Sequence, residues 1–370
     1  MKIVSKLYNY LLRFDIFYRH IGNYYENKNK KALPKHLMHI NKAEIVTIKK
    51  TNPKNLKIKI GISKSGVISK NIKTDYTYKQ ARLLLNNNLN YSLINLHTSN
   101  WIEEAKKLDI IIWQTGSAPS PIYETRSKLY FLEEYLGKFC FPNYREIWSY
   151  EDKIRLNYIL SQYSIPLVPT FISFDRAEAY DFVKNTKYPI VSKLTTCSGS
   201  RGVKLIKSKM AAKNLVNKVF SIGAKTPYNY LKQKDYVYFQ DFIPEATYDL
   251  RIILVGDKIM GYYRMKPNND FRASGAGNFF IDELPIDAVK TAIKVKKILK
   301  SRIIAVDFID SKNGHLVIEA SIFTGRKGNE MFTGYYTLNN DEQLVFHEGK
   351  YWLQELVLKE VVEEYINKQS

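Results

Sequence analysis

The sequence predicts an α/β domain with a parallel sheet, followed by an α+β part built on antiparallel sheets. Strand-like and helix-like segments alternate between residues 45 and 150, which is typical of parallel strands joined by crossover helices. After residue 150, strand-like segments come in adjacent pairs separated by short turns, which favours hairpins. The length of 370 residues and a hydrophobic content of 45% allow two or three domains with a large packed core.

The first part contains four expected strands and three expected helices. The strands are Leu56–Ile62, Tyr91–His97, Asp109–Gly116 and the segment KFCFPN at residues 138–143. The helices are Tyr78–Leu85, Trp101–Lys107 and a longer one from residue 121 to 137. The last strand would close this domain near residue 150.

The second part begins with a predicted helix that Ser149 would cap and Pro166 would stop. Leu156, Ile159 and Leu160 can share one face of that helix. The later expected helices are Lys209–Phe220, residues 287–300 and a helix at the C-terminus. The later expected strands are Ile190–Leu194, Val203–Ile206, residues 235–243, two runs around the turn Gly256-Asp257, residues 303–310 and residues 314–320.

The composition excludes several classes of protein. No N-terminal run resembles a secretory signal, and no apolar stretch approaches the ~20 residues that span a bilayer. Cys140 and Cys197 lie far apart without CxxC spacing, so neither a disulfide framework nor a zinc site is indicated. We therefore expect an intracellular protein, either cytoplasmic or peripheral at the inner face of the membrane.

The formal charge of +21 is concentrated near the N-terminus. Residues 1–60 carry 12 Lys and 2 Arg but only three acidic residues, Asp15, Glu26 and Glu44. We call residues 1–44 the basic arm, in which aromatic residues alternate with this charge. Such a segment suits an anionic membrane surface, a nucleic acid or an acidic polymer. A solvated helix that packs its aromatic residues on the body explains the pattern equally well.

A lysine and a glycine loop indicate a phosphate site. Lys193 lies in an apolar strand, where an ammonium group must be paired or bound to an anion, unless it snorkels from a strand edge. The loop Ser198, Gly199, Ser200, Arg201 and Gly202 follows within a few residues. Backbone N–H groups at glycines can approach a triphosphate closely, although such a loop can equally be a hairpin turn. It is not a Walker motif.

Two carboxylates indicate a metal site. Asp307 and Glu319 each interrupt an apolar strand, and a tight turn between the strands would place both side chains on one face of the sheet. Paired hard oxygen ligands of this kind suit Mg²⁺ that bridges phosphates. Arg251, Arg264 and Arg272 supply cations between the loop and the acids.

The order of these segments resembles the ATP-grasp superfamily, and within it the RimK-type carboxylate–amine ligases, over about residues 45–325. The resemblance implies that Lys153, in the entry helix, contacts phosphate, as do Lys193 and the loop 198–202. It places adenine beside a hinge and gives Asp249 a ribose-binding or structural role. The hinge residues are Gln240, Asp241, Phe242 and Ile243. Arg272, in NDFRAS, and Arg264 would lie near the reacting phosphate as catalytic residues.

The metal strands depart from the family at one position. The family's usual ending is Glu, any residue and Asn before a Pro-Gly turn, whereas this chain has Glu319, Ala320 and Ser321 before Thr324-Gly325. The resemblance implies that Asp307, Glu319 and the Ser321 hydroxyl bind Mg²⁺, or Mn²⁺ in its place. ATP would be the nucleotide.

The resemblance implies a pre-ATP-grasp domain at 45–150 and ATP-grasp subdomains at 151–232 and 233–370. It also implies an ATP-dependent ligase that forms an amide through an acylphosphate. An acidic peptide or an envelope polysaccharide is the acceptor that the basic charge favours. Two alternatives stay open: a non-catalytic protein that binds nucleotide or polyanion, favoured by the departure at Ser321, and an ATP-grasp enzyme that uses another nucleophile.

Overall fold

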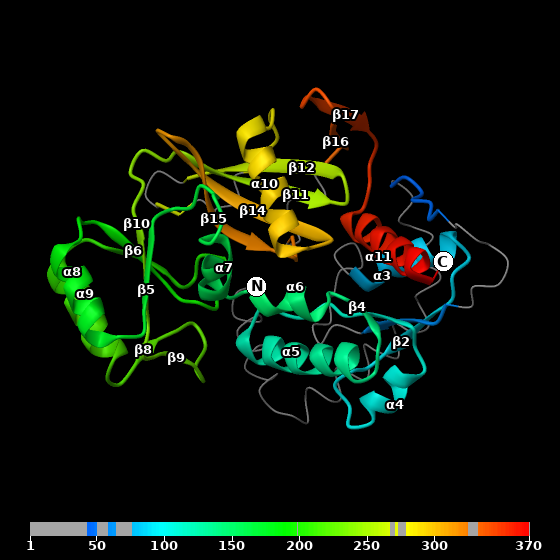
Figure 1. The fold of residues 1–370 in the computed structure, drawn as a ribbon, viewed down its shortest axis with the longest axis horizontal. Helices are drawn as coiled ribbons and strands as arrows, with labels where there is room; N and C mark the ends of the chain where they lie inside the picture. Colours follow the sequence, from blue (N-terminus) through cyan, green and yellow to red (C-terminus); the bar gives the residue numbers. More distant parts are fainter. Residues whose placement is uncertain are drawn as a thin grey trace, which may run out of the picture.

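The computed structural model describes residues 43–49, 58–63, 76–197, 199–266, 271–272, 279–324 and 332–369, apart from the side chain of Tyr78. Three larger sheets and a two-stranded ribbon organise this part of the chain. In Figure 1 the first domain lies at the lower right, a small green lobe lies at the left, and a long sheet crosses the top between them. Almost all of the basic arm lies outside the described residues.

The first domain contains the predicted parallel sheet, in the order β2-β1-β3-β4. Its strands are β1 (Ile60–Ser63), β2 (Tyr91–Ile94), β3 (Ile110–Ile112) and β4 (Phe139–Phe141). Its helices are α3 (Tyr76–Asn86), α4 (Trp101–Lys106) and α5 (Pro119–Glu134). β3 is buried throughout, since helices cover both faces of a parallel sheet. The strands are shorter than predicted: residues 95–97 after β2, for example, form a turn, and residues 56–57 of the first predicted strand lie outside the described residues.

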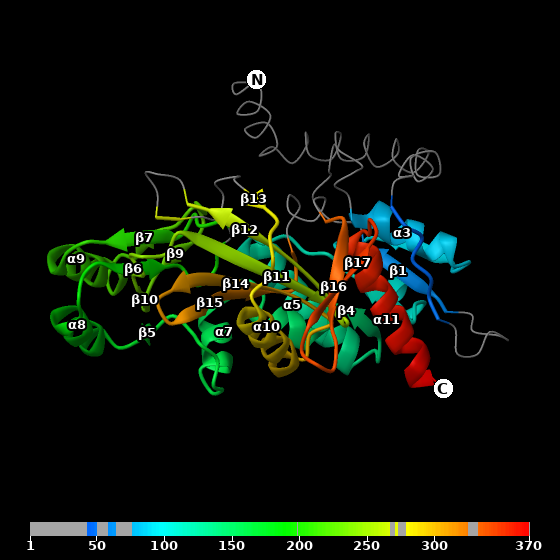
Figure 2. The same ribbon diagram turned by 90° about the horizontal axis from the view of Figure 1, so that it is seen from above.

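The small lobe is an antiparallel sheet in the order β5-β10-β6-β7. The strands are β5 (Thr170–Ser173), β6 (Ile190–Lys193), β7 (Val203–Ile206) and β10 (Val237–Asp241). Helices α8 (Arg176–Asn185) and α9 (Lys209–Val219) lie side by side on one face, as Figures 1 and 2 show. The ribbon of β8 (Ala224–Lys225) and β9 (Lys232–Gln233) extends below it. The opposite face of this sheet borders a cavity.

The long sheet runs β15-β14-β11-β12-β16-β17, with β13 paired to β12. Its strands are β11 (Tyr248–Val255), β12 (Lys258–Met265), β13 (Phe279–Phe280), β14 (Ile303–Ser311), β15 (Gly314–Ser321), β16 (Gly334–Leu338) and β17 (Leu344–Glu348). Helices α10 (Ile286–Leu299) and α11 (Leu353–Gln369) pack against it. The two predicted hairpins, at Gly256-Asp257 and between β14 and β15, are confirmed.

Successive side chains along β11 point to opposite faces of the long sheet. Leu250, Ile252 and Leu254 belong to the core beneath α10. Ile253 and Val255 point the opposite way and pack in the core shared with α11 and the first domain. Alternate residues of a strand share a face, so Arg251 lies on the same face as Ile253. One face of the sheet is therefore apolar near α11 and charged further along.

The start of the second part differs from the prediction. Ser149 ends a short helix, α6 (Tyr144–Ser149), and does not cap the next one. The cap of α7 (Lys153–Leu160) is Asp152, whose side chain accepts from the Arg155 N–H at 3.1 Å. Thr195 Oγ1 also donates to Asp152 at 2.9 Å. The cap thus joins α7 to the loop after β6, and this contact favours Asp152 over Ser149.

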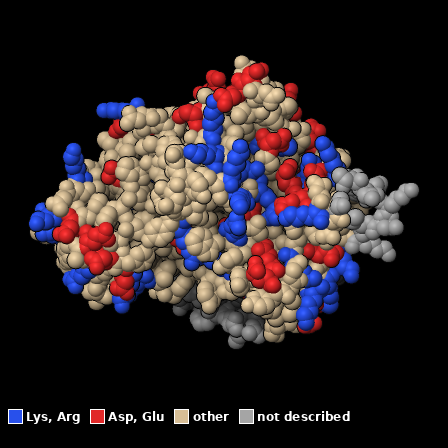
Figure 3. Space-filling model, viewed as in Figure 1, with Lys and Arg blue, Asp and Glu red and all other residues tan. Residues whose placement is uncertain are grey.

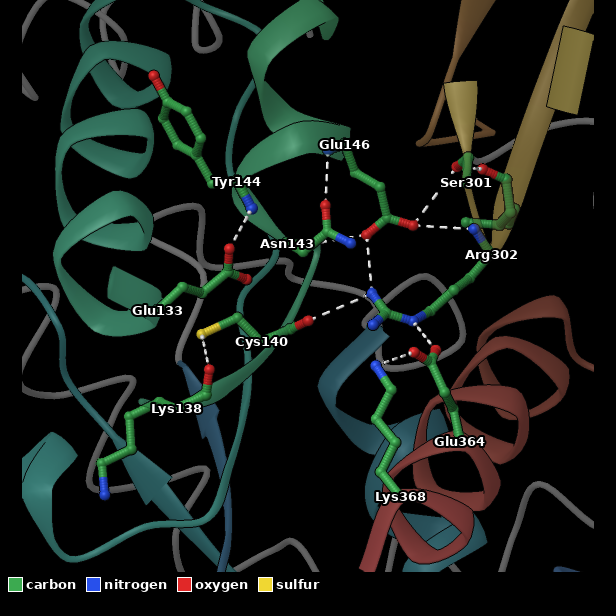
Figure 4. Close-up of polar contacts among 11 residues, drawn as sticks. Glu133, Lys138, Cys140, Asn143, Tyr144, Glu146, Ser301, Arg302, Glu364 and Lys368 are labelled. Atoms are coloured by element: carbon green, nitrogen blue, oxygen red, sulfur yellow. Dashed lines mark hydrogen bonds and ion pairs between the residues drawn. The ribbon is translucent and has the colours of Figure 1, made fainter. Parts of the chain in front are cut away.

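A buried ion-pair network joins the first domain to the long sheet and to α11 (Figure 4). Glu146, from α6, accepts from both the backbone N–H of Arg302 (2.9 Å) and its guanidinium (3.0 Å). The same guanidinium donates to Glu364 of α11 and to the carbonyl of Cys140 at 3.3 Å. The Glu146 side chain is fully buried. Arg302 therefore ties three elements together away from the site.

Lysine and arginine side chains gather near the middle of one face, where α10 lies (Figure 3). The exposed lysines of α10 and its C-cap include Lys290, Lys294, Lys297 and Lys300. No helix among the described residues is long and apolar enough to cross a membrane.

Candidate active site

A cavity of about 560 Å³ lies between the small lobe and the long sheet, with the first domain at one end. Most of the residues predicted to bind or react line it. These are Lys153, Lys193, Gly199, Ser200, Gln240, Asp241, Phe242, Ile243, Asp249, Arg264, Arg272, Asp307, Glu319 and Ser321. Segments more than 160 residues apart in the sequence thus meet around one space.

Lys153 is the first residue of α7 and is buried. Its ammonium group donates to Glu319 Oε1 at 2.9 Å and to the Cys197 carbonyl at 3.0 Å. Burial favours loss of the Lys153 proton, but Glu319 and Glu151 outweigh it and hold the pKa of Lys153 above its ordinary value. A permanent positive charge therefore lies between β15 and the loop after β6.

Lys193 ends β6, where it pairs in register with Val203. Burial lowers the pKa of Lys193 to about 8, against the pull of Glu319, and Lys153 lowers it further. An ammonium group that loses its proton this readily lacks a sufficient counter-charge. A bound phosphate would supply that charge.

The loop after β6 approaches the cavity through its backbone. Gly199 (φ +63°) and Ser200 (φ +56°) both adopt left-handed conformations. A Cβ at Gly202 would lie 2.8 Å from the Leu194 side chain, so only glycine fits there without displacement. Ser198 lies outside the described residues.

Two predicted phosphate ligands are not brought to the cavity. Arg201 is exposed, and its guanidinium lies over the Tyr228 ring, 5.7 Å from the centroid. Neither Arg201 nor Gly202 is among the cavity-lining residues. The turn at Gly199 and Ser200 faces the cavity instead.

Asp307 and Glu319 are directly opposite each other on β14 and β15. A β-bulge follows, because Phe308 pairs with Val317 and leaves Ile318 as the extra residue. Both Ile318 and Glu319 line the cavity as a result. The expected placement of the two acids on one sheet face is therefore observed.

Arginines hold Asp307. Arg251 donates two bonds of 2.6 Å to its two carboxylate oxygens, and Arg264 Nη2 lies 3.1 Å from Oδ2. Burial opposes ionisation of Asp307, but Arg251 and Arg264 outweigh it, so the pKa of Asp307 lies well below its usual range. Asp307 is a carboxylate at every physiological pH.

Arg264 also donates to Asp249, its cross-strand neighbour. Burial raises the pKa of Asp249 to about 6, although Arg264 acts the other way. Asp249 lies against the wall of the cavity as a buried partner of Arg264, which agrees with the structural alternative for this residue and leaves a ribose contact untested.

The predicted hinge lies at the end of β10. The Gln240 amide donates to Thr170 at 2.8 Å and to the Tyr238 hydroxyl at 3.2 Å, so it is held within the small lobe. Phe242 makes an edge-to-face contact with Phe271 at 6.1 Å. Arg272 donates to the Ser200 carbonyl at 3.4 Å, which brings it to the glycine loop.

A divalent metal fits this donor set only with help from phosphate. The described residues include no group of three His, Cys, Asp or Glu side chains that could hold a metal. Asp307 and Glu319 nevertheless face each other on the cavity wall, and Mg²⁺ is commonly held by one or two carboxylates plus phosphate oxygens. The Ser321 hydroxyl donates to the Phe323 carbonyl at 3.0 Å. Two carboxylates thus face the site, each already paired with a cation, and the third predicted ligand is engaged in a turn.

Sequence reasoning missed the contribution of the first domain. Gln114, Thr115, Gly116 and Ser117 line the cavity directly after β3. The carboxyl ends of parallel strands commonly carry ligand sites, so this signal was present in the sequence. Glu151 and Lys266, also in the lining, follow no pattern that the sequence reveals.

Comparison with known families decides the assignment. A model of the RimK-like ATP-grasp domain matches residues 150–345, which is more than half of the chain. The chain belongs to the RimK-like ATP-grasp family. The predicted family, the ATP-grasp fold and the class of ATP-dependent amide-forming ligase are therefore confirmed.

Two curated members of the RimK-like ATP-grasp family illustrate the likeness. The alpha-aminoadipate–LysW ligase LysX of Saccharolobus solfataricus is 32% identical over 196 residues, covering 52% of this chain and 68% of that protein. A protein named probable alpha-L-glutamate ligase from Vibrio atlanticus is 28% identical over 237 residues, covering 63% of this chain and 74% of that one.

Solved structures support the ATP-grasp fold. The D-cycloserine synthetase DcsG matches with a TM-score of 0.56 at 11% identity, covering 83% of this chain and 99% of that one. The macrocyclase MdnC from Microcystis aeruginosa, bound with precursor peptide MdnA, gives 0.55 at 13% identity, covering 82% and 99%. At these identities the likeness concerns the fold alone.

Proposed function

We propose that this ligase activates a carboxylate substrate with ATP, as an acylphosphate, inside the cavity between the small lobe and the long sheet. The observation that carries the proposal is the meeting of Lys153, Lys193, Asp307 and Glu319 around one space. Two buried ammonium groups can neutralise phosphates, and two opposed carboxylates can share a metal with them.

ATP would occupy the cavity between the small lobe and the long sheet. Its adenine would contact the strand end at Asp241, Phe242 and Ile243, while Gln240, held by Thr170, shapes the pocket from within the lobe. Its phosphates would reach Lys153, Lys193 and the turn at Gly199–Ser200. A phosphate beside Lys193 would raise the pKa of that group again, because an opposite charge favours the protonated form.

The residues around the phosphates would act chiefly by position and charge. Lys153 and Lys193 would hold the γ-phosphate in line with the acid substrate, and Arg272 would stabilise the charge that develops during transfer. Arg264 is held by Asp249 and Asp307, so we assign it the role of fixing the cavity wall and orienting Asp307. No step needs a covalent bond to the protein.

We propose Mg²⁺, with Mn²⁺ as an alternative, as the cofactor of this site. Asp307 and Glu319 would hold it, and it would supply charge neutralisation between the phosphates. When the ion binds, Glu319 would interact with both the ion and the Lys153 ammonium group. Ser321 is the weaker ligand because its hydroxyl is bonded to Phe323.

The substrate class follows from the relatives and the charge. Their names indicate α-aminoadipate and glutamate, so we propose an acidic amino acid or an acidic peptide as one partner of the reaction. The basic arm favours an anionic acceptor, including an acidic envelope polysaccharide, or a peripheral position at an anionic membrane surface. ATP as substrate favours a cytoplasmic location.

An assay with hydroxylamine tests the proposal without knowledge of the amine. The purified chain is incubated with ATP, Mg²⁺, hydroxylamine and one acid at a time: L-glutamate, L-2-aminoadipate, glucuronate or a glutamate-rich peptide. An acylphosphate is trapped as a hydroxamate, and ADP appears in equal amount. ATP binding without ADP or hydroxamate from any of the four acids would favour the non-catalytic alternative, and ADP without hydroxamate would favour another nucleophile.

A further inference from the structure

Glu151 is a cavity-lining carboxylate that no proposed step yet uses. It directly precedes Asp152, the cap of α7, and adopts a left-handed backbone conformation with φ +51°. Such a conformation is strained for glutamate, and strained residues often lie at functional sites. Its Oε2 atom is buried and has no hydrogen-bond partner in the described part of the chain. A buried acceptor without a donor is costly unless a ligand satisfies it.

The electrostatic neighbours of Glu151 locate it within the cavity. Burial raises its pKa most, Glu319 raises it further, and Lys153, Arg201 and Arg251 lower it, so these four charged groups lie within electrostatic range of Glu151. Lys153 and Glu319 are the residues to which the phosphates and the metal are assigned in the proposed function. Glu151 therefore lies where the acylphosphate would form.

Glu151 also differs from the other carboxylates at this end of the cavity. Asp307 is held by Arg251, Asp249 by Arg264, and Glu319 by Lys153. Glu151 has no cation within bonding distance among the described residues. Burial and Glu319 together raise the pKa of Glu151 to about 7. A buried carboxylate without a bonded cation can accept a hydrogen bond from a positively charged donor. The ammonium group of a substrate is such a donor.

We propose that Glu151 is a catalytic residue that binds the ammonium form of the amine substrate and accepts its proton. This inference rests on the proposed function, because it needs an acylphosphate beside Glu319. An ammonium nitrogen has no lone pair, so it must lose a proton before it can attack. Glu151 takes that proton, the nitrogen forms a bond to the acyl carbon, and the carbon–oxygen bond to phosphate breaks. The phosphate leaves with the second proton of the nitrogen, and Glu151 returns its own proton to solvent.

Other nearby groups are less suited to this role. Tyr150 also lines the cavity, but burial raises its pKa well above the ordinary value, so it holds its proton at neutral pH. Lys153 is held protonated by Glu319 and Glu151. A general base works best with a pKa near the operating pH, and Glu151 meets that condition.

The test compares two nucleophiles in the Glu151→Gln variant. Hydroxylamine is largely unprotonated at neutral pH, so its attack needs no base, whereas an α-amino group, with a pKa of about 8, is mostly protonated. The acid that gives hydroxamate in the assay above is used with hydroxylamine and, separately, with a panel of L-amino acids as amines. Glu134→Gln, an exposed carboxylate on α5, is the matched control.

We expect Glu151→Gln to form hydroxamate within about threefold of the wild-type rate but to form amide at least 100-fold more slowly. The Glu134→Gln control should match wild type in both. Equal loss of hydroxamate and amide by a folded variant that binds ATP would overturn the inference, as would undiminished amide formation; in both cases the proposed function stands. Failure of wild type to form hydroxamate with any acid of the panel would overturn the proposed function and this inference with it. A Glu151→Asp variant should recover part of the amide rate, because it restores a carboxylate.

Discussion

Asp307 and Glu319 face each other across β14 and β15, yet each carboxylate is bonded to a different cation. Asp307 accepts two 2.6 Å bonds from Arg251, and Glu319 accepts one of 2.9 Å from Lys153. Like charges directly opposed on paired strands repel each other, and the two cations offset that repulsion. Both carboxylates therefore line the same cavity with a cation beside each.

Replacing Glu319 with glutamine separates catalysis from architecture. Glu319→Gln keeps an acceptor for Lys153 but removes one of the two anionic metal ligands, so ATP turnover should fall at least 100-fold at saturating Mg²⁺. The stability of the nucleotide-free protein should fall by only about 1 kcal/mol. ADP release and thermal melting measure the two effects. A loss of about 3–5 kcal/mol with normal ATP consumption would show a structural ion pair instead.

Ser321→Asn tests the departure from the family pattern. The asparagine would offer a carbonyl oxygen to the metal in place of a hydroxyl that now bonds to Phe323. We expect the Mg²⁺ concentration for half-maximal ATP turnover to fall several-fold. Ser321→Ala is the control, and it should raise that concentration if the hydroxyl binds metal. An unchanged Mg²⁺ requirement in both variants would mean that Ser321 stabilises the turn and does not bind the metal.

The placement of the two acids could be predicted from the sequence because it depends on local rules. Asp307 and Glu319 are joined by a tight turn, and alternation along a strand then decides the face on which they lie. The same rules placed Lys193 in a hairpin strand, which in the structure ends at this residue. The bulge that brings Ile318 to the cavity could not be predicted, because no glycine marks it.

Local sequence rules could not predict the contacts between distant segments. Lys153 and Glu319 are 166 residues apart, and only the packing of α7 against β15 brings them together. Ser149 and Asp152 are both good helix caps by type. The choice between them depends on Thr195, which donates to Asp152 from another element.

The affinity for ATP should depend on the protonation of Lys193. Because burial lowers the pKa of Lys193 to about 8, the free protein loses this positive charge as the pH rises above 8. Phosphate binds the charged form, so ATP affinity should fall by up to tenfold per pH unit from about pH 8 upward. Lys193→Arg keeps its charge and should bind ATP with little pH dependence between 7 and 9.5. Calorimetric titration with the non-hydrolysed ATP analogue AMPPNP measures this, and parallel pH profiles for the two proteins would contradict it.

The network around Arg302 should affect stability and not the chemistry. Glu146→Ala leaves a guanidinium that is largely buried without its main partner, so the free energy of unfolding should fall by about 3–5 kcal/mol. Glu103→Ala removes an exposed partner of Lys106 and should cost no more than about 1 kcal/mol. Chemical denaturation compares the two variants. Equal losses would mean that the burial of Glu146 carries no special weight, and loss of ATP affinity in the folded Glu146 variant would mean that the network reaches the site.

Glu133 should make the folded state less stable as the pH rises. Burial raises the pKa of Glu133 to about 7, although it accepts the Tyr144 N–H at 2.9 Å. A carboxyl group whose folded pKa exceeds the unfolded value binds its proton more tightly in the folded state. Its contribution to stability is therefore complete below about pH 4.5 and is lost as the pH rises through 7.

The Glu133→Gln variant keeps an acceptor for Tyr144 without the charge. After allowance for partial exposure, it should be about 1 kcal/mol more stable than wild type at pH 8.5 and no more stable at pH 5. Urea denaturation at the two pH values measures the difference, with the exposed Glu348→Gln on β17 as control. A gain of equal size at both pH values would show that the charge of Glu133 is not its cause.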